Sequence, residues 1–163
     1  MKKVILGLLA SWTVTVLAGQ PNDVRIDVTG TFDANRIFIG TFTASGAFDE
    51  LGSVQDTPNF VGQAVHISRL MTTASGEFIV VEINTTHVAG LHVTPPDWCA
   101  PPPLPPGALL FYQTGSWKVA YGTGPYSLLQ GNGKRATWLL FDSVSLAPIA
   151  ATECLIGDAK DGP

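Results

Sequence analysis

The chain has 163 residues, enough for about one domain, with 9 basic residues, 13 acidic residues and a net charge of -4. Charged residues make up 13% and apolar residues 45% of the sequence, so the chain is too apolar to belong to the disordered class. Its mildly acidic balance excludes the basic footprint of a nucleic-acid-binding protein and gives no attraction to an anionic membrane surface.

The first eighteen residues have the features of an export signal. Lys2 and Lys3 precede an uncharged apolar stretch at 4–18, and Val16 and Ala18 are small residues at the positions that a signal peptidase inspects. The apolar run is shorter than the ~20 residues of a membrane-spanning helix. We therefore predict a signal peptide at 1–18, with cleavage after Gly19 as the close alternative. The mature domain at 19–163 is predicted to be soluble, free of the membrane, and secreted (extracellular) or periplasmic.

Strand-like segments separated by turn residues follow one another along the mature chain, and no helical period persists. They lie at 24–28, 36–44, 47–55, 65–73, 77–87, 109–113, 116–121, 134–141, 144–149 and 152–156. A turn region containing Asp56, Pro58 and Gly62 is expected between the third and fourth segments. The pattern predicts an all-β fold, a small antiparallel β-barrel of about eight strands, with a β-sandwich as the alternative.

Two segments, 41–48 and 71–78, share the sequence Thr-Ala-Ser-Gly followed two residues later by phenylalanine, and predict two similar hairpins. A two-residue Ser75-Gly76 loop in the second hairpin sets Arg69 opposite Glu82, on a face that is otherwise mostly apolar. Such a pair is either a structural cross-strand bridge or the polar part of a pocket. Arg69 and Glu82 are therefore the candidate ligand-binding residues.

Residues 90–107 contain seven prolines around Trp98 and Cys99, which predicts a loop or polyproline II segment rather than a central strand. Cys99 and Cys154 are the two cysteines of the chain, and an oxidising compartment favours a disulfide between them, with two buried free thiols as the alternative. The disulfide would pin the proline-rich loop to the last strand, where the loop could rim or cover a barrel mouth.

No motif in the sequence identifies a catalytic group, a cofactor or a metal. There is no G-x-S-x-G nucleophile elbow, and neither the cysteines nor His66, His87 and His92 have a zinc-type spacing. The glycine-rich segment 122–133 continues as a strand, unlike a phosphate-binding loop, and its glycines are interpreted as turns and bends of a curved sheet. We therefore assign no catalytic residue, no cofactor and no metal, which favours a protein that is not an enzyme.

One local pattern carries a family resemblance. Trp117 is followed by Gly122-Thr123-Gly124-x-Tyr126-x-x-Leu129-x-Gly131-x-Gly133, which resembles a pattern in small secreted bacterial proteins of uncharacterised function. These proteins are in turn similar to the eight-stranded barrels of the allene oxide cyclase and dirigent type. The resemblance implies a closed barrel with a central cavity and self-association into a homo-oligomer. The proline-rich insertion departs from it, and the matching positions carry over no catalytic residue.

These observations lead to one main functional hypothesis and two alternatives. The main hypothesis is a secreted barrel that binds a small apolar or amphipathic molecule, because a barrel of eight strands can hold one small ligand. Arg69 and Glu82 would fix the orientation of that ligand. The alternatives are a cyclase-like or isomerase-like enzyme that acts by confining its substrate, and a non-catalytic module of a surface assembly.

Overall fold

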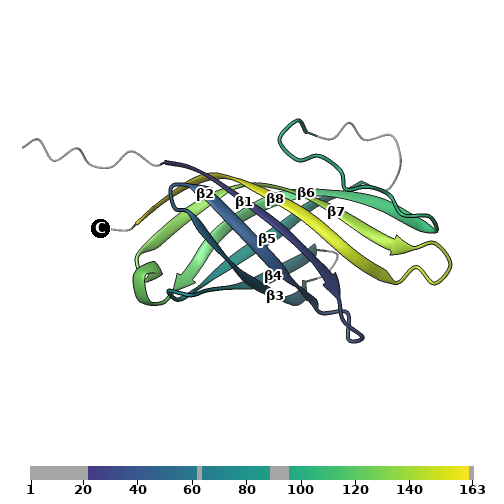
Figure 1. The fold of residues 1–163 in the computed structure, drawn as a ribbon, viewed down its shortest axis with the longest axis horizontal. Coiled ribbons are helices and arrows are strands. Elements are labelled where there is room, and N and C mark those ends of the chain that lie inside the picture. Colours follow the sequence, from purple (N-terminus) through teal and green to yellow (C-terminus); the bar gives the residue numbers. More distant parts are fainter. Residues whose placement is uncertain (1–21, 62–63, 89–95, 162–163) are drawn as a thin grey trace, which may run out of the picture.

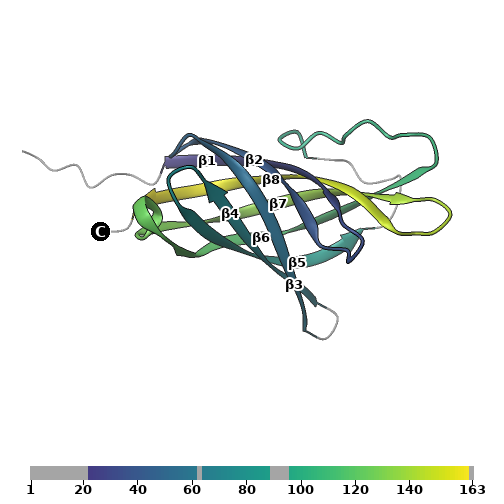
Figure 2. The ribbon, with the colours of Figure 1, turned by 60° about the horizontal axis from the view of Figure 1, so that its bottom comes forward.

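A computed structural model describes residues 22–61, 64–88 and 96–161, which leaves the predicted signal peptide and His92 outside the described residues. The chain forms a closed antiparallel sheet in which each strand pairs with the next and β8 pairs with β1 (Figures 1 and 2). The predicted eight-stranded barrel is confirmed. Its strands are β1 Asn22–Phe32, β2 Phe38–Gly46, β3 Glu50–Val61, β4 Ala64–Thr73, β5 Glu77–Val88, β6 Ala108–Gly122, β7 Leu129–Asp142 and β8 Pro148–Asp161.

Alternation of polarity along β1 shows how the sequence forms the barrel wall. Val24, Ile26 and Val28 are buried inside, whereas Arg25 and Asp27 face outward, with 2.6 Å between Arg25 Nε and Asp27 Oδ2. Successive side chains of a strand point to opposite faces, so the apolar residues at every second position share the interior. The other strands follow the same alternation, and their inward-facing side chains fill the interior of the barrel.

Two of the predicted divisions between strand segments are wrong. The segments 109–113 and 116–121 belong to one strand, β6, which runs through Gly115. The segment 144–149 is not a separate strand, because the Asp142 carboxylate accepts hydrogen bonds from the backbone N–H groups of Val144 and Ser145 and stabilises a turn there. β8 begins only after this turn, at Pro148.

The predicted turn is wrong for Asp56 and Pro58, which lie within β3, whereas Gly62 lies outside the described residues. The pairing of β2 with β3 ends at Ile39 and Gln55, so beyond Gln55 the strand β3 is paired only with β4. Pro58 lacks a backbone N–H and is tolerated in a strand whose second edge has no partner. Asp56 is tolerated in the interior because it lies directly opposite Arg69.

The β4–β5 hairpin has a different register from the predicted one. The two-residue loop is Ala74-Ser75, since Thr73 N–H donates to Gly76 O at 2.9 Å and Thr72 lies opposite Glu77. The Thr73 hydroxyl accepts hydrogen bonds from the N–H groups of Ser75 and Gly76, which favours this turn. Arg69 is therefore opposite Val80, two residues before Glu82, its predicted partner. A shift of two leaves every side chain on its predicted face.

The glycine-rich segment closes one end of the barrel. Gly122 ends β6 and Gly124 begins the short 3₁₀ helix Gly124–Tyr126 of the β6–β7 turn, while Gly131 and Gly133 lie within β7, so the four glycines are not all in turns. Tyr126 packs on Phe78 with ring centroids 5.1 Å apart, and the rings of Phe42 and Phe48 surround Phe78. This aromatic cluster fills the interior at the closed end.

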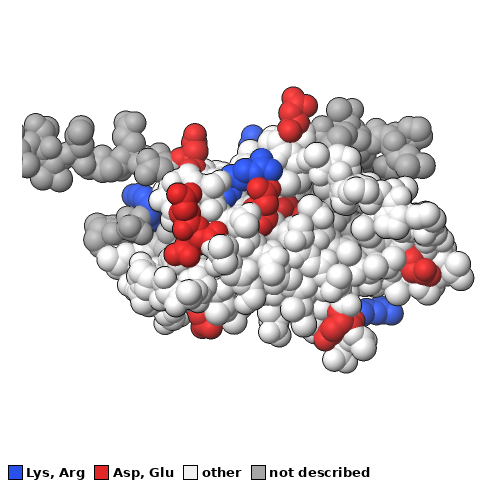
Figure 3. Space-filling view, viewed as in Figure 1, with Lys and Arg blue, Asp and Glu red and all other residues white. Residues whose placement is uncertain are grey.

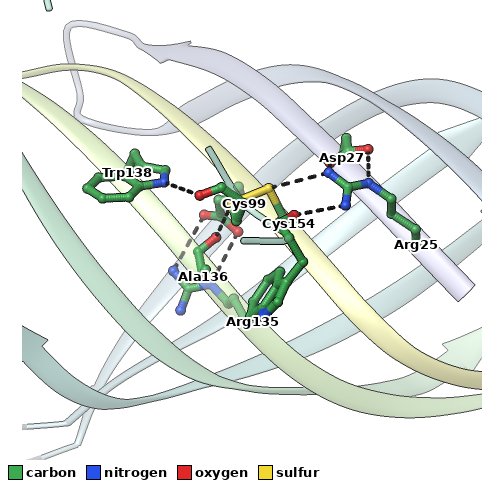
Figure 4. The surroundings of a disulfide bond; sticks show 9 residues. Arg25, Asp27, Cys99, Arg135, Ala136, Trp138 and Cys154 are labelled. Carbon is green, nitrogen blue, oxygen red and sulfur yellow. Dashed lines mark hydrogen bonds and ion pairs between the residues drawn. A yellow bond between two sulfur atoms is a disulfide. The ribbon is translucent and has the colours of Figure 1, made fainter. Parts of the chain in front are cut away.

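The proline-rich loop lies on the outer wall, where Cys99 and Cys154 are at disulfide distance with 2.15 Å between their sulfur atoms (Figure 4). The carbonyl oxygen of Cys99 accepts a hydrogen bond from Trp138 Nε1, and that of Trp98 accepts one from Arg25. The predicted pairing and loop are thus confirmed for the described residues. None of the described loop residues 96–107 lines the cavity of about 220 Å³ inside the barrel, and residues 90–95 of the predicted loop lie outside the described residues.

Replacing both cysteines by alanine is expected to lower the free energy of unfolding by about 4 kcal/mol, because the link spans a separation of 55 residues. Urea denaturation followed by far-UV circular dichroism measures this loss. The wild-type protein under reducing conditions should match the double variant, and the variant itself should not respond to the reductant. Equal stability of the oxidised and reduced wild-type protein would contradict the assignment.

Candidate functional site

Five charged side chains lie together inside the barrel. They are buried, although the whole sequence has only 22 acidic and basic residues, and much of the outer face shown in Figure 3 carries no charge. Charges in an interior destabilise a protein unless they are paired and hydrogen-bonded. We call this group the ion cluster; its members are Asp56 on β3, Arg69 on β4, Glu82 on β5, Arg135 on β7 and Glu153 on β8.

Arg69 is the centre of the ion cluster and uses its whole guanidinium group. Its Nε and Nη2 donate to the two oxygens of Asp56 at 2.6 and 2.7 Å. Its Nη1 donates to Glu82 at 2.8 Å and to Glu153 at 2.7 Å, and Nη2 donates also to Glu153 at 3.1 Å. Five hydrogen bonds match the five N–H donors of an arginine, so Arg69 has no further donor to offer.

Arg135 approaches the same carboxylates from the other side of the barrel. Its Nε lies 2.8 Å from Glu82 Oε2 and 3.2 Å from Glu153 Oε2, and the hydrogen bond goes to Glu153. Glu82 Oε2 therefore has a cation beside it but accepts no hydrogen bond. Among the described residues, the hydroxyl of buried Thr137 also has no hydrogen-bond partner. The ion cluster therefore contains a carboxylate oxygen, Glu82 Oε2, that could accept a further hydrogen bond.

Burial and ion pairing act differently on the three carboxyl groups. Burial raises the pKa of Glu82 to about 7, against the attraction of Arg135 and Arg69. Burial also raises the pKa of Glu153, but attraction to Arg135 and Arg69 outweighs it and lowers that pKa to about 2. The pKa of Asp56 is raised, since its burial exceeds the attraction of Arg69. Two arginines cannot fully neutralise three carboxylates, and Glu82, with no exposed surface, takes up the proton most readily.

A cavity of about 220 Å³ lies directly beside the ion cluster, at the end of the barrel opposite the aromatic cluster. Its walls are apolar, and Asp56, Arg135 and Glu153 form its polar floor. Arg36, in the β1–β2 turn, and Gln113 also line it. The apolar wall residues include Phe32, Phe38, Ile67, Leu139, Phe141 and Ala151. Both ingredients of a small-molecule site, an apolar enclosure and a few polar groups, are therefore present.

The structure brings the two predicted site residues together, although not in the predicted way. Arg69 and Glu82 both face the interior and form an ion pair at 2.8 Å, but neither lines the cavity. Sequence reasoning missed Asp56, which it assigned to a turn, and gave no role to Arg135 and Glu153. A single arginine in the apolar strand segment 134–141 was the available signal for Arg135.

Comparisons with protein-family models, with curated proteins and with solved structures found no match to this chain. The resemblance to barrels of the allene oxide cyclase and dirigent type therefore stays a prediction. Among the described residues, no helix has the length and apolar character needed to cross a bilayer. The described residues also contain no group of three or more side chains suited to hold a metal ion.

The ion cluster predicts an unusual dependence of stability on pH. The folded state holds the Glu82 proton up to about pH 7, whereas the unfolded chain loses it near 4.5, so stability falls as the pH rises through this range. The expected loss is up to about 3 kcal/mol. Glu153 acts in the opposite sense, because its stabilisation is present above 4.5 and is lost as the pH falls through about 2.

Urea denaturation at pH 5 and pH 8 measures this effect. Glu82→Gln cannot titrate, so its loss of stability between the two pH values should be much smaller than that of the wild-type protein. Glu77→Gln, on the exposed start of the same strand, is the matched control and should keep the wild-type dependence. An identical decline in Glu82→Gln and the wild-type protein would show that Glu82 does not carry the proton.

Proposed function

We propose that this protein binds one small amphipathic molecule in the cavity at the open end of its barrel. The observation that carries the proposal is the position of the cavity, with apolar walls and with Asp56, Arg135 and Glu153 at its floor. An apolar body would pack against the walls, and a polar group would reach the charged floor. This arrangement resembles the general design of ligand pockets, in which a few polar groups set the orientation.

The size of the cavity limits the ligand. At about 220 Å³ it is smaller than the ~300–1,000 Å³ of typical ligand pockets. It is larger than the roughly 150 Å³ apolar cavity that accepts benzene in an engineered protein. A molecule with one ring, or an aliphatic chain of similar volume, and one short polar arm is therefore the appropriate class.

Arg69 and Glu82 enter this proposal as positioning residues. Arg69 binds the carboxylates of both Asp56 and Glu153, and Glu82 lies against Arg135, so the pair holds all three floor side chains in place. The side chains of Arg69 and Glu82 have no exposed surface, and the ligand would contact the floor above them. Side chains that make precise polar contacts must themselves be held rigidly by the residues behind them.

A confinement enzyme is the second candidate, favoured by one observation. Glu153 lines the cavity as a carboxylate whose pKa its two arginines lower to about 2, and Glu82 lies behind the floor with a pKa that burial raises to about 7, so the pair combines a base with a proton-holding group. If a turnover is found, Glu82→Gln separates the candidates. A large loss of rate with intact binding would favour catalysis, and an unchanged rate would favour binding alone.

We further propose that the protein works outside the cytoplasm. The leader-like segment 1–18 and the buried cysteine pair at disulfide distance support this location, since disulfides persist in oxidising compartments. Expression of the full chain in a bacterial host, followed by fractionation and N-terminal sequencing, tests it. The expected result is a processed, oxidised protein in the periplasm or medium. A full-length reduced protein in the cytoplasm would refute it.

Filling the cavity is expected to abolish binding without unfolding the barrel. Ala151 is buried on β8 and lines the cavity, so the phenyl ring of Ala151→Phe would occupy the space of a ligand. Benzyl alcohol, a single ring with one hydroxyl group, is the probe, and the measurement is an NMR titration. The wild-type protein should show saturable shifts at cavity residues, and Ala151→Phe should lose them.

Ala150→Phe is the matched control, because Ala150 is the preceding residue of β8, is only half-buried and does not line the cavity. It should bind benzyl alcohol as the wild-type protein does. If the wild-type protein binds neither benzyl alcohol nor any other single-ring probe, the proposed function is wrong. If Ala151→Phe binds as well as Ala150→Phe, the site lies elsewhere.

A further inference from the structure

The charge of the cavity floor limits the kind of polar group that the ligand can carry. The ion cluster has three carboxyl groups and two guanidinium groups, so it has one net negative charge when all five are ionised. The group is buried, and buried charges are screened by salt far less than exposed ones. Arg36 also lines the cavity, but it is exposed and lies in the same turn as the exposed carboxylate of Asp33.

The hydrogen bonds of the floor show the same excess of acceptors. All five N–H donors of Arg69 are occupied by carboxylates, so an anionic ligand would gain nothing from this arginine without breaking an existing bond. Each carboxylate oxygen can accept more than one hydrogen bond. Glu82 Oε2 and Thr137 Oγ1 are buried and have no hydrogen-bond partner among the described side chains. The donors of a ligand would meet the carboxylates of Asp56 and Glu153, which line the cavity.

The walls favour a cation as well. Phe32, Phe38 and Phe141 line the cavity, and Arg69 already lies over the Phe38 ring at 5.2 Å from its centroid. The faces of aromatic rings attract cations, most strongly where water is excluded. An aromatic wall above an acidic floor is thus electrostatically complementary to an organic cation and repels an anion.

On the basis of the proposed binding function, we infer that the ligand is a small organic amine that enters the cavity as its ammonium ion. Its N–H groups donate to the floor carboxylates of Asp56 and Glu153, and its apolar body lies between the phenylalanine rings. The specificity therefore comes from the net charge and the spare acceptors of the floor, and the affinity from the apolar walls.

Three probes of nearly equal size and different charge test this inference. Benzylamine, benzyl alcohol and benzoate are titrated into the full mature protein at pH 8 and low salt, with NMR shifts of the cavity residues as the readout. Benzylamine should bind at least about tenfold more tightly than benzyl alcohol, a difference of roughly 1.4 kcal/mol. Benzoate should bind more weakly than either.

The outcomes separate this inference from the proposed function. If benzyl alcohol binds in the cavity and benzylamine binds no more tightly, the cavity is a binding site but the amine inference is wrong. If benzoate binds most tightly, the ligand is an anion and the inference is overturned. If no probe binds, the proposed function itself fails.

A charge variant adds an independent test. Asp56→Asn removes one negative charge at the floor, where the Asp56 side chain keeps 8% of its surface exposed, and should reduce the preference for benzylamine over benzyl alcohol. Asp33→Asn removes a charge from the exposed turn beside the mouth and should leave the preference unchanged. If Asp56→Asn and Asp33→Asn prefer benzylamine over benzyl alcohol to the same extent, the inference is contradicted. If Asp56→Asn does not fold, the three probes on the wild-type protein still decide.

The pH dependence gives a final check. Glu82 faces Arg69 on β4, Arg135 on β7, Glu153 on β8 and Asp56 on β3, whereas β6 places Trp117 opposite it. Its pKa of about 7 means that the floor gains its net negative charge as the pH rises through neutrality. The affinity for benzylamine should therefore rise between pH 6 and pH 8, while that for benzyl alcohol stays constant. Constant benzylamine affinity across this range would count against the floor charge as the source of specificity.

Discussion

The arrangement of this barrel depends on the guanidinium group of Arg69. A side chain with five donors and no exposed surface must find acceptors on every side, and it finds them on strands β3, β5 and β8. Removing one partner from such a buried network costs roughly 3–5 kcal/mol, because a charge is left uncompensated. A packed apolar layer of the same volume would be as stable or more so. Stability alone therefore does not account for the charges of the ion cluster.

The ion cluster also divides the interior into two unequal halves. On one side, Phe42, Phe78 and Tyr126 fill the barrel with aromatic rings, and the glycine-rich turn allows the close approach of Tyr126. A Cβ at Gly122 would lie 2.1 Å from the Tyr126 carbonyl oxygen, so the turn cannot accept a larger residue there. On the other side of the ion cluster, the side chains of the barrel wall leave the cavity between them. The same sheet therefore supplies both a stable core and a cavity that opens at one end.

Much of the fold was predictable because each strand of a closed barrel keeps its apolar side chains at every second position. The face of Arg69 and Glu82 was predicted correctly even though the hairpin loop was placed one residue too late, since the resulting error of two preserved the parity of the strand. The boundaries of β3 and β8 were less predictable. Asp56 and Pro58 favour turns locally, and only the opposing Arg69 and the unpaired strand edge allow them in a strand.

The residues at the floor of the cavity could not be predicted from the sequence, for a different reason. The proline-rich loop covers part of the outer wall of β7 and β8, and the usual polarity is inverted locally beneath it. Ala136, Trp138 and Cys154 face outward and are nevertheless buried under that loop, while Arg135 and Glu153 face inward. Alternation alone assigns such arginine and glutamate residues to solvent. Only the position of the loop, fixed by Cys99, reveals which face is the interior.

The aromatic cluster at one end of the barrel has a kinetic consequence. A ligand of the proposed kind that reached the floor beside Glu153 would be blocked by this cluster, so it would enter and depart at the end of the barrel where the described turns at 33–37 and 143–147 lie. Substitutions in those turns would change the two rate constants together and leave their ratio nearly constant. Substitutions at the floor would change the rate of departure alone. Under the proposed binding function, equilibrium specificity and speed of exchange would thus depend on separate parts of the chain.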